Sequence, residues 1–216
     1  MITDRDCIQA ILDLYNGATE PWADLLWPAA DDGVCFGLRR IGDDDLVVFR
    51  GSVTAQDWAR DFMAIPHQPG SHPQLGDVHL GFMQGLDTAL AHLQPLLRAK
   101  VTIAGHSLGA ARATLFCGLL IAWGLIPMAR VVFGEPRSGC DDLTNLLRVI
   151  PHNVSYRNAD IHGHDLVTDV PTSPPFNRVT PLIDVYAPPP PNDSWGLLAY
   201  HHAYLYQNGL NSINPV

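Results

Sequence analysis

Hydrophobic positions predict helices in three segments of the chain, two of them by helical spacing and the third by a long apolar run. Between residues 8 and 15, apolar side chains lie three or four positions apart, and the pattern stops before Gly17, a residue type that often follows the last turn of a helix. Leucines with the same spacing predict a second helix over residues 86–97, in spite of Pro95. The longest apolar run, residues 113–129, is too short and too interrupted by glycine and proline to span a membrane, so we expect a buried core helix there.

Short β-rich runs alternate with these helical segments. The runs 34–41 and 46–50 flank a Gly-Asp-Asp-Asp segment at 42–45, which predicts a hairpin with a solvated acidic tip. Three further strands are expected at residues 101–104, 130–134 and 154–157. Strands that alternate with helices predict an α/β protein with a mostly parallel sheet covered on both faces. From Pro171 onward the chain is rich in proline, and we expect an extended segment with little regular structure that wraps the domain surface before the last short elements.

Length and charge narrow the class of protein. The 216 residues are 47% hydrophobic and contain no linker-like stretch, so we expect a single domain over residues 1–216. The formal net charge of −9 argues against nucleic acid and anionic membrane surfaces as partners. Residues 1–6 do not resemble a signal peptide, so a cytoplasmic location is the default expectation, with secretion left open. The four cysteines lie at no metal-ligand spacing and are expected to be free thiols.

The pentapeptide Gly-His-Ser-Leu-Gly at residues 105–109 carries the strongest chemical signal. It follows a β-rich run and precedes a long apolar segment, which is the strand-turn-helix context of a nucleophile elbow. The glycines suit a sharp turn in which a Cβ would collide with the strand or the helix. Ser107 is therefore the candidate nucleophile, and the backbone N–H of Leu108, the next residue, is a candidate oxyanion donor.

A serine nucleophile needs a histidine base and an acid that orients it, and on this scaffold both follow the serine in the chain. Several residues downstream of Ser107 meet this requirement, and their order alone does not select among them. The candidate acids are Glu135, Asp141, Asp142, Asp160, Asp165 and Asp169, and the candidate histidines are His152, His162, His164, His201 and His202.

Five short patterns occur along the chain in a fixed order. They are F-R-G-S in residues 46–52 followed by D-W and D-F at 57–58 and 61–62, V-H-L-G-F at 78–82, G-H-S-L-G at 105–109, F-G-E-P-R-S-G at 133–139, and D-L-V at 165–167 followed by Pro171. Together they resemble the class 3 lipases, the family of the small fungal triacylglycerol lipases. The resemblance implies an α/β-hydrolase-like three-layer sandwich with a central, mostly parallel sheet flanked by helices. It also implies a serine esterase or lipase that hydrolyses carboxylic esters.

Carried over residue by residue, the resemblance makes Ser107 the nucleophile and Asp165 the acid. Asp160 is the rival acid, and the spacing to the later proline favours Asp165. The base is then one histidine of the pair His201 and His202.

The choice within this histidine pair depends on neighbouring tyrosines. The family's base is usually followed by an aromatic residue five positions later, as His201 is by Tyr206. A tyrosine two positions before the base is also common, and Tyr200 precedes His202 in this way. We choose His201 and keep His202 as the alternative.

The resemblance assigns the second oxyanion donor to Ser52 and implies no cofactor and no metal. Two hypotheses that assign the chain to other classes of protein stay open. One is a non-catalytic binding protein on a lipase-like fold. The other is a zinc-dependent hydrolase that uses His162 and His164 beside Asp165, because two histidines and a carboxylate are plausible zinc ligands.

The expected substrate is a small-molecule or lipid ester. Residues 53–60, which correspond to the lid of the fungal relatives, contain one large apolar residue, Trp58, so we expect short to medium acyl chains and little interfacial activation. Oligomeric state and the physiological ester are left open by the sequence. Candidates for the acyl pocket are Phe82, Leu108, Ile161, Leu166, Val167 and Leu197.

Overall fold

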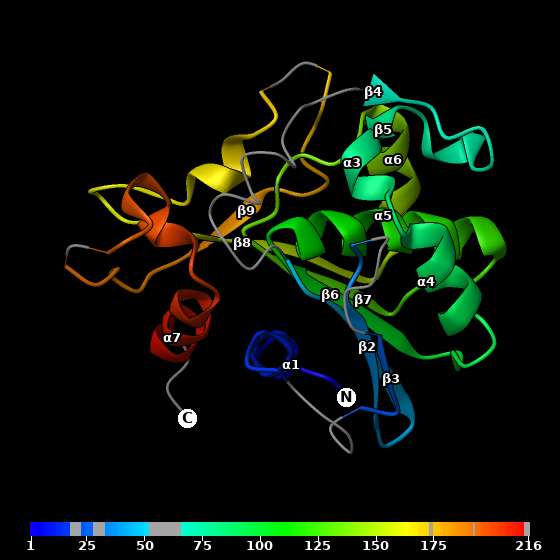
Figure 1. Cartoon of the computed structure of the whole chain (residues 1–216), viewed down its shortest axis with the longest axis horizontal. Helices are drawn as coiled ribbons and strands as arrows, with labels where there is room; N and C mark the ends of the chain where they lie inside the picture. The colour runs from blue at the N-terminus through cyan, green and yellow to red at the C-terminus, as the bar shows by residue number, and fades with distance from the viewer. Residues whose placement is uncertain (18–22, 28–32, 52–65, 173–174, 192, 214–216) are drawn as a thin grey trace.

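The strands form one central sheet in a computed structural model that describes residues 1–17, 23–27, 33–51, 66–172, 175–191 and 193–213. Within these residues the sheet has seven strands in the order β1-β2-β3-β6-β7-β8-β9 (Figure 1). The strands are β1 (Leu25–Trp27), β2 (Phe36–Ile41), β3 (Asp44–Phe49), β6 (Val101–His106), β7 (Ala129–Phe133), β8 (His152–Asn158) and β9 (Leu182–Val185), and a separate two-stranded sheet pairs β4 (Pro66–His67) with β5 (Val78–His79).

Strand direction divides the sheet into two parts. The pairs β1–β2 and β2–β3 are antiparallel, whereas β3, β6, β7, β8 and β9 run parallel to one another. The carboxyl ends of the parallel strands therefore meet at one edge, where Phe49 pairs with Gly105 and His106 pairs with Phe133. This confirms the mostly parallel sheet expected from the sequence, and it places the Gly-His-Ser-Leu-Gly turn at that edge.

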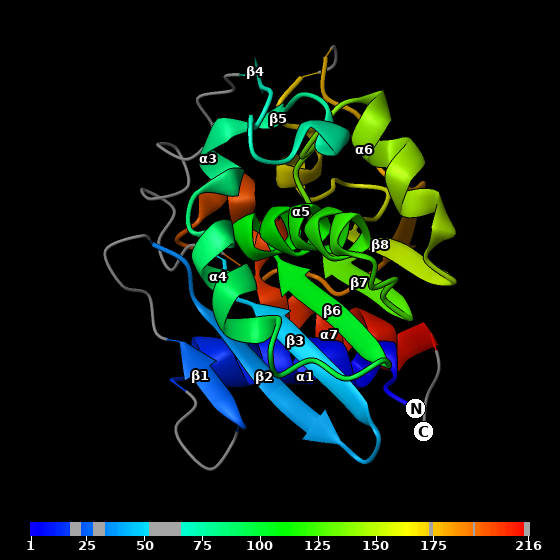
Figure 2. The same cartoon turned by 90° about the vertical axis from the view of Figure 1, so that its right-hand side faces the viewer.

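Helices cover both faces of the sheet, as Figure 2 shows. On one face, alternate strand residues such as Val47 and Ile103 join a core with α3, α4 and α5. On the other face, residues such as Val48 and Ala104 join a core with α1 and α7, which contact each other. The helices are α1 (Asp4–Tyr15), α3 (Leu80–Met83), α4 (Leu86–Leu93), α5 (Leu108–Trp123), α6 (Asp141–Leu146) and α7 (Ala203–Ile213), with 3₁₀ turns η1 (Pro73–Leu75), η2 (Leu147–Val149), η3 (Leu166–Asp169) and η4 (Gly196–His201).

The first helix and the central helix both form where the sequence pattern predicts helices, although the central helix spans Leu108–Trp123 and not residues 113–129. Helix α1 begins after a Thr3 capping box and ends at Tyr15, with Asn16 as its C-cap just before Gly17, and it packs against the sheet. Helix α5 is buried through its first thirteen residues and ends at Gly124, which is left-handed. Among the described residues, no helix is both long and apolar enough to cross a membrane.

Three local predictions were wrong. The hairpin tip was expected to be solvated, and Asp43 does lie in an exposed turn. Asp45, however, is fully buried, and it accepts hydrogen bonds from the backbone and guanidinium of Arg98 at 2.7 Å each. Helix α4 ends at Leu93 instead of continuing to residue 97, because Pro95 cannot continue the helical hydrogen bonds. The proline-rich segment contains regular structure, since β9 joins the sheet there.

One buried histidine has no hydrogen-bond partner for its ring among the described residues. His79 is 1% exposed, its ring stacks on Phe82 at 3.8 Å between centroids, and neither ring nitrogen bonds to a described residue. Burial lowers the pKa of His79 to about 4, so the ring is neutral at pH 7. A buried polar group without a partner costs about 1–3 kcal/mol.

We therefore expect His79→Phe to raise the free energy of unfolding by about 1–2 kcal/mol at pH 7. The unfolded histidine binds a proton near pH 6.5 and the folded one only near pH 4, so this group makes the wild type less stable as pH falls between these values. The variant should lose this contribution, up to about 1.4 kcal/mol per pH unit. Urea unfolding at pH 7 and pH 5 tests both effects, with His162→Phe, at an exposed position, as the control. An unchanged pH slope in His79→Phe would contradict the expectation.

Candidate active site

Ser107 lies in the turn that connects β6 to α5. Its backbone has φ 61° and ψ −130°, and it is the one non-glycine residue with positive φ among those described. The turn is held by close backbone contacts: a Cβ on Gly105 would lie 2.5 Å from the carbonyl carbon of Gly109, and a Cβ on Gly109 would lie 2.7 Å from the carbonyl carbon of Phe49 in β3. The turn therefore has the strained geometry expected of a nucleophile elbow.

The N-terminus of α5 directly follows Ser107. Leu108 is the first residue of α5, and the N–H groups of a first helical turn have no acceptor within the helix. The helix dipole adds a partial positive charge at the same point. Ser52, the other predicted oxyanion residue, and Trp58 lie outside the described residues.

Asp165 and His201 come together behind the elbow. Asp165 follows β8 and caps η3, where its Oδ1 accepts a 2.9 Å hydrogen bond from the N–H of Val167. Its Oδ2 lies 2.6 Å from Nδ1 of His201, the last residue of η4. Asp165 is fully buried and His201 is 1% exposed, so water does not compete for this bond.

Tyr206 is a third partner of this carboxylate. From the first turns of α7, its hydroxyl donates to the same Oδ2 of Asp165. Burial alone raises the pKa of Asp165, but the charge of His201 and the hydrogen bonds from His201 and Tyr206 outweigh it, so the pKa lies below the usual range. Burial and the neighbouring carboxylate raise the pKa of Tyr206, which keeps its proton. Asp165 is therefore an anion held by three donors.

This bond sets the tautomer of His201. An anionic carboxylate can only accept a hydrogen bond, so Nδ1 carries the hydrogen, and in this tautomer Nε2 is left with a lone pair. Nε2 makes no hydrogen bond to any described residue, Ser107 included. In structures without substrate, the bond between nucleophile and base is often long, and it shortens only when substrate binds. Within the described part of the chain, this basic nitrogen of His201 is therefore not engaged.

His106, the residue before the nucleophile, supports His201 from the other side of the ring. Its Nε2 lies 2.8 Å from the carbonyl oxygen of His201 and its Nδ1 lies 3.0 Å from the hydroxyl of Tyr15 in α1. Burial, followed by the nearby His201, lowers the pKa of His106 to about 3, so it is neutral. Nε2 therefore donates to the carbonyl, and Nδ1 accepts from Tyr15, which in turn receives a hydrogen bond from the backbone of Gly51.

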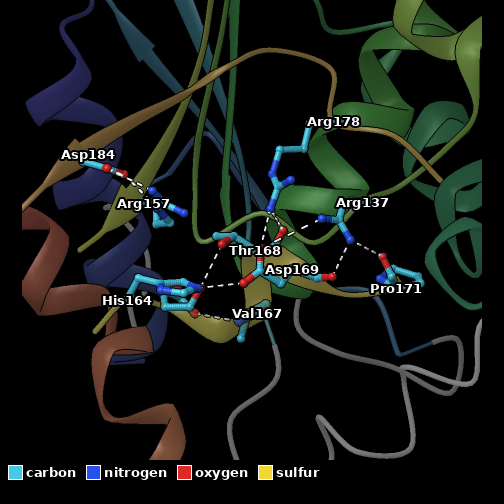
Figure 3. A network of polar contacts seen from close by, with 10 residues as sticks. Arg137, Arg157, His164, Val167, Thr168, Asp169, Pro171, Arg178 and Asp184 are labelled. Carbon is cyan, nitrogen blue, oxygen red and sulfur yellow. Dashed lines mark hydrogen bonds and ion pairs between the residues drawn. The ribbon is translucent and has the colours of Figure 1, made fainter. Parts of the chain in front are cut away.

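A network of arginines holds the turn that carries Asp165 (Figure 3). Arg178 donates to the carboxylate of Asp169 at 2.6 Å and to the carbonyl of Thr168 at 2.7 Å, and His164 lies 2.7 Å from the other Asp169 oxygen. Arg137 donates to the carbonyls of Asp169 and Pro171. The far end of η3 is thus tied to the segment after β7, while its near end carries Asp165.

The other histidines predicted as candidates lie elsewhere. His202 turns away from Asp165, and its Nε2 lies 2.9 Å from Asp193 instead. His152 pairs with Asp4 at 2.8 Å on the surface, and His162 is exposed. The structure therefore brings His201, and not His202, to the candidate acid.

The rival acids have separate partners. Asp160 accepts hydrogen bonds from the backbone of His162 and Gly163, and Glu135 pairs with Arg130 at 2.9 Å. Asp141 bonds to Asn177, Asp142 lies in the first turn of α6, and Asp169 belongs to the arginine network.

The zinc reading is not supported by the side chains of the loop. His164 is bonded to Asp169 and Asp165 to His201, so His162, His164 and Asp165 do not converge. Across the described residues, no group of three or more His, Cys, Asp or Glu side chains could hold a metal ion. No disulfide bond links the four cysteines, all of which lie in the described part of the chain.

The predicted pocket residues differ in exposure. Phe82 and Val167 are fully buried and Leu108 is 6% exposed, so these three belong to the packed interior. Ile161 is 94% and Leu166 37% exposed, and the side chain of Leu197 lies outside the described part.

Sequence reasoning missed the supporting residues. The spacing of Tyr206 from His201 was used only to choose between the two histidines. A tyrosine five positions after a base can, however, reach the acid from the following helix. Tyr15 belongs to no motif, and His106 appeared only as part of the G-H-S-L-G pattern, with no role assigned to its side chain.

An elbow serine and a buried histidine–aspartate pair at the carboxyl edge of a mostly parallel sheet define an α/β-hydrolase-like protein. Residues 46–174 match the family described as Lipase (class 3), which is more than half of the chain. The chain therefore belongs to the class 3 lipase family and is a carboxylic ester hydrolase. A search of curated protein sequences found no match.

Solved structures show the same fold. The triacylglyceride lipase of Rhizomucor miehei is 19% identical, with 85% of this chain and 77% of that chain covered and a TM-score of 0.59. The mono- and diacylglycerol lipase of Aspergillus oryzae is 22% identical, with 79% and 65% covered and a TM-score of 0.60. A triacylglycerol lipase whose catalytic centre is a serine protease triad is 20% identical, with 78% and 71% covered and a TM-score of 0.56. At these identities the likeness concerns the fold.

Gly134 gives a test of this geometry. Its φ is 57°, and a Cβ there would lie 2.7 Å from Oδ2 of Asp165 and 2.8 Å from the ring of His201. We expect Gly134→Ala to displace this pair and to lower kcat about 10²-fold in ester hydrolysis assays. Gly124→Ala is the matched control, because Gly124 also has positive φ but has no atom within 4 Å of the added Cβ. Both variants should lose about 1–2 kcal/mol of stability, and equal activity losses would count against the proposed geometry.

Proposed function

We propose that Ser107, His201 and Asp165 act as a catalytic triad for the hydrolysis of carboxylic esters. The observation that carries the proposal is the buried 2.6 Å bond between Nδ1 of His201 and Oδ2 of Asp165, at the sheet edge that presents the Ser107 elbow. The class 3 lipase family and the serine triad of one structural neighbour support it.

Each residue has one task in the reaction. Nε2 of His201 takes the proton of the Ser107 hydroxyl as its oxygen attacks the ester carbonyl. The resulting imidazolium is stabilised by the anionic Asp165, and it then protonates the leaving alcohol. A water molecule, activated by the same nitrogen, attacks the acyl-enzyme and releases the acid.

The negative charge on the carbonyl oxygen needs fixed donors. The N–H of Leu108, at the N-terminus of α5, is one donor in this proposal, and Ser52 is the other, carried over from the family pattern. Loss of one such donor typically lowers kcat about 10²–10³-fold.

The proposed substrates are esters with short to medium acyl chains. The segment 53–60 contains one large apolar residue, and a single such side chain is too few for a lid that covers a wide apolar site. The acidic composition also disfavours adsorption to anionic lipid.

Alanine variants separate the candidate bases. Ser107→Ala and His201→Ala should each lower kcat for p-nitrophenyl esters at least about 10³-fold, because each removes a member of the triad. His202→Ala should lower it by less than about tenfold, since it removes one hydrogen bond to Asp193. If His202→Ala abolishes turnover while His201→Ala keeps it, the assignment is wrong. Activity that survives Ser107→Ala but is lost to a chelator would instead favour a metal enzyme.

A series of acyl chain lengths tests the substrate proposal. We expect kcat/KM to be highest for short to medium p-nitrophenyl esters, and the rate to rise smoothly through the solubility limit of tributyrin. Rates of wild type and Ser107→Ala, measured below and above that limit, provide the comparison. A sharp increase above the limit in the wild type alone would show interfacial activation and would overturn this part of the proposal.

A further inference from the structure

Tyr15, the last residue of α1, connects separate parts of the active site through its hydroxyl group. This hydroxyl lies 3.0 Å from Nδ1 of His106, and it accepts a hydrogen bond from the backbone N–H of Gly51. The other ring nitrogen of His106, Nε2, lies 2.8 Å from the carbonyl oxygen of His201. A chain of hydrogen bonds therefore runs from the segment after β3, through α1 and the elbow, to the base.

The direction of each bond in this chain is fixed. A carbonyl oxygen only accepts, so Nε2 of His106 carries the hydrogen, and Nδ1 of this neutral ring is an acceptor. Burial raises the pKa of Tyr15, so its hydroxyl keeps its proton and donates it to Nδ1. The lone pairs of the same oxygen are left for the N–H of Gly51. The hydroxyl of Tyr15 therefore satisfies a donor on one side and an acceptor on the other.

Gly51 lies directly against the nucleophile. A Cβ on Gly51 would lie 2.6 Å from the carbonyl oxygen of His106 and 2.8 Å from Cβ of Ser107, so the backbone of Gly51 touches the elbow. The same Cβ would lie 2.6 Å from the hydroxyl of Tyr15. Gly51 directly precedes Ser52, the second oxyanion donor of the proposed function. Because a peptide group is planar, a shift of Gly51 would carry the N–H of residue 52 with it.

The other end of the chain holds the base. Asp165 binds Nδ1 of the His201 ring, whereas His106 binds the carbonyl oxygen of His201 and stacks on its ring at 4.6 Å between centroids. These contacts together set the direction in which Nε2 of His201 points. Catalysis is sensitive to this direction, since a misplacement of about 1 Å can lower a rate about 10²-fold.

We propose that Tyr15 is a positioning residue for ester hydrolysis, an inference that rests on the proposed triad. Its hydroxyl holds Gly51, and with it the N–H of residue 52, and through His106 it holds the base His201, both in fixed places relative to Ser107. The family match covers residues 46–174 and therefore assigns no role to Tyr15. Helix α1 is in this proposal a part of the catalytic apparatus as well as a cover for the sheet.

Tyr15→Phe tests the proposal, because it removes one oxygen atom and keeps the ring. We expect kcat for p-nitrophenyl butyrate to fall about tenfold, since Nδ1 of His106 and the N–H of Gly51 both lose their partner beside Ser107. KM should change less than about twofold, because a misplaced base and a misplaced donor weaken interactions made in the transition state and not in the bound substrate. Steady-state kinetics of the wild type and the variant measure both constants.

Tyr156→Phe is the matched control. The hydroxyl of Tyr156, in β8, donates to Asp4 at the opposite end of α1, so this variant also removes one tyrosine hydroxyl that binds the helix. Its kcat should equal that of the wild type, because neither Tyr156 nor Asp4 belongs to the chain of hydrogen bonds. Equal losses of kcat in Tyr15→Phe and Tyr156→Phe would show that only the docking of α1 matters, and they would overturn the proposal.

His106→Phe breaks the chain at its next residue and keeps a ring against His201. It should also lower kcat, and in the double variant with Tyr15→Phe the two losses should be less than additive, because they remove shared contacts. Fully additive losses, or wild-type kinetics in Tyr15→Phe, would refute the role of Tyr15. If urea denaturation shows that Tyr15→Phe is unfolded, His106→Phe is compared with Tyr156→Phe instead. Ser107→Ala and His201→Ala in the same assay report on the triad separately.

Discussion

The buried carboxylate of Asp165 is the constraint on which the rest of the site depends. An ionised carboxylate in a protein interior is strongly unfavourable unless hydrogen-bond donors surround it. The donors here come from three places: the first turn of η3, the end of η4 and the hydroxyl of Tyr206, which is 41 residues away in the chain. Since none of these segments satisfies the charge alone, the acid turn, the base and α7 are stable only when docked together.

Strain at the elbow is offset by the same docking. The positive φ of Ser107 costs on the order of 1–3 kcal/mol, and it persists because the glycines on either side allow β6, α5 and β3 to touch through their backbones. Helix α5 is buried nearly throughout, so its N-terminus cannot shift to relieve the turn. Packing therefore holds Ser107 in place, whereas the hydrogen bonds to the charged Asp165 hold the acid and the base together.

The sequence predicted the parts of this arrangement that depend on local pattern. The periodicity of α1, the apolar run of α5 and the strand before residue 105 are local, and each was confirmed. Asp45 was misjudged because its burial depends on Arg98, 53 residues away, and β9 because a short strand in a proline-rich segment forms only against an existing sheet. The choice of His201 as the partner of Asp165 followed from resemblance and not from composition, because neighbouring histidines differ only in the direction of their side chains. The pairing of His202 with Asp193 was not predicted.

The contact of His106 with Tyr15 has a consequence for how this family can vary. The position between the first glycine and the serine is written as variable in the general elbow motif, yet here its side chain joins the N-terminal helix to the backbone of His201. A substitution at residue 106 that leaves stability and activity unchanged would then require a compensating substitution at residue 15, 91 positions earlier. In an alignment of relatives, these two columns should co-vary, and a library that randomises residue 106 alone should contain few tolerated substitutions.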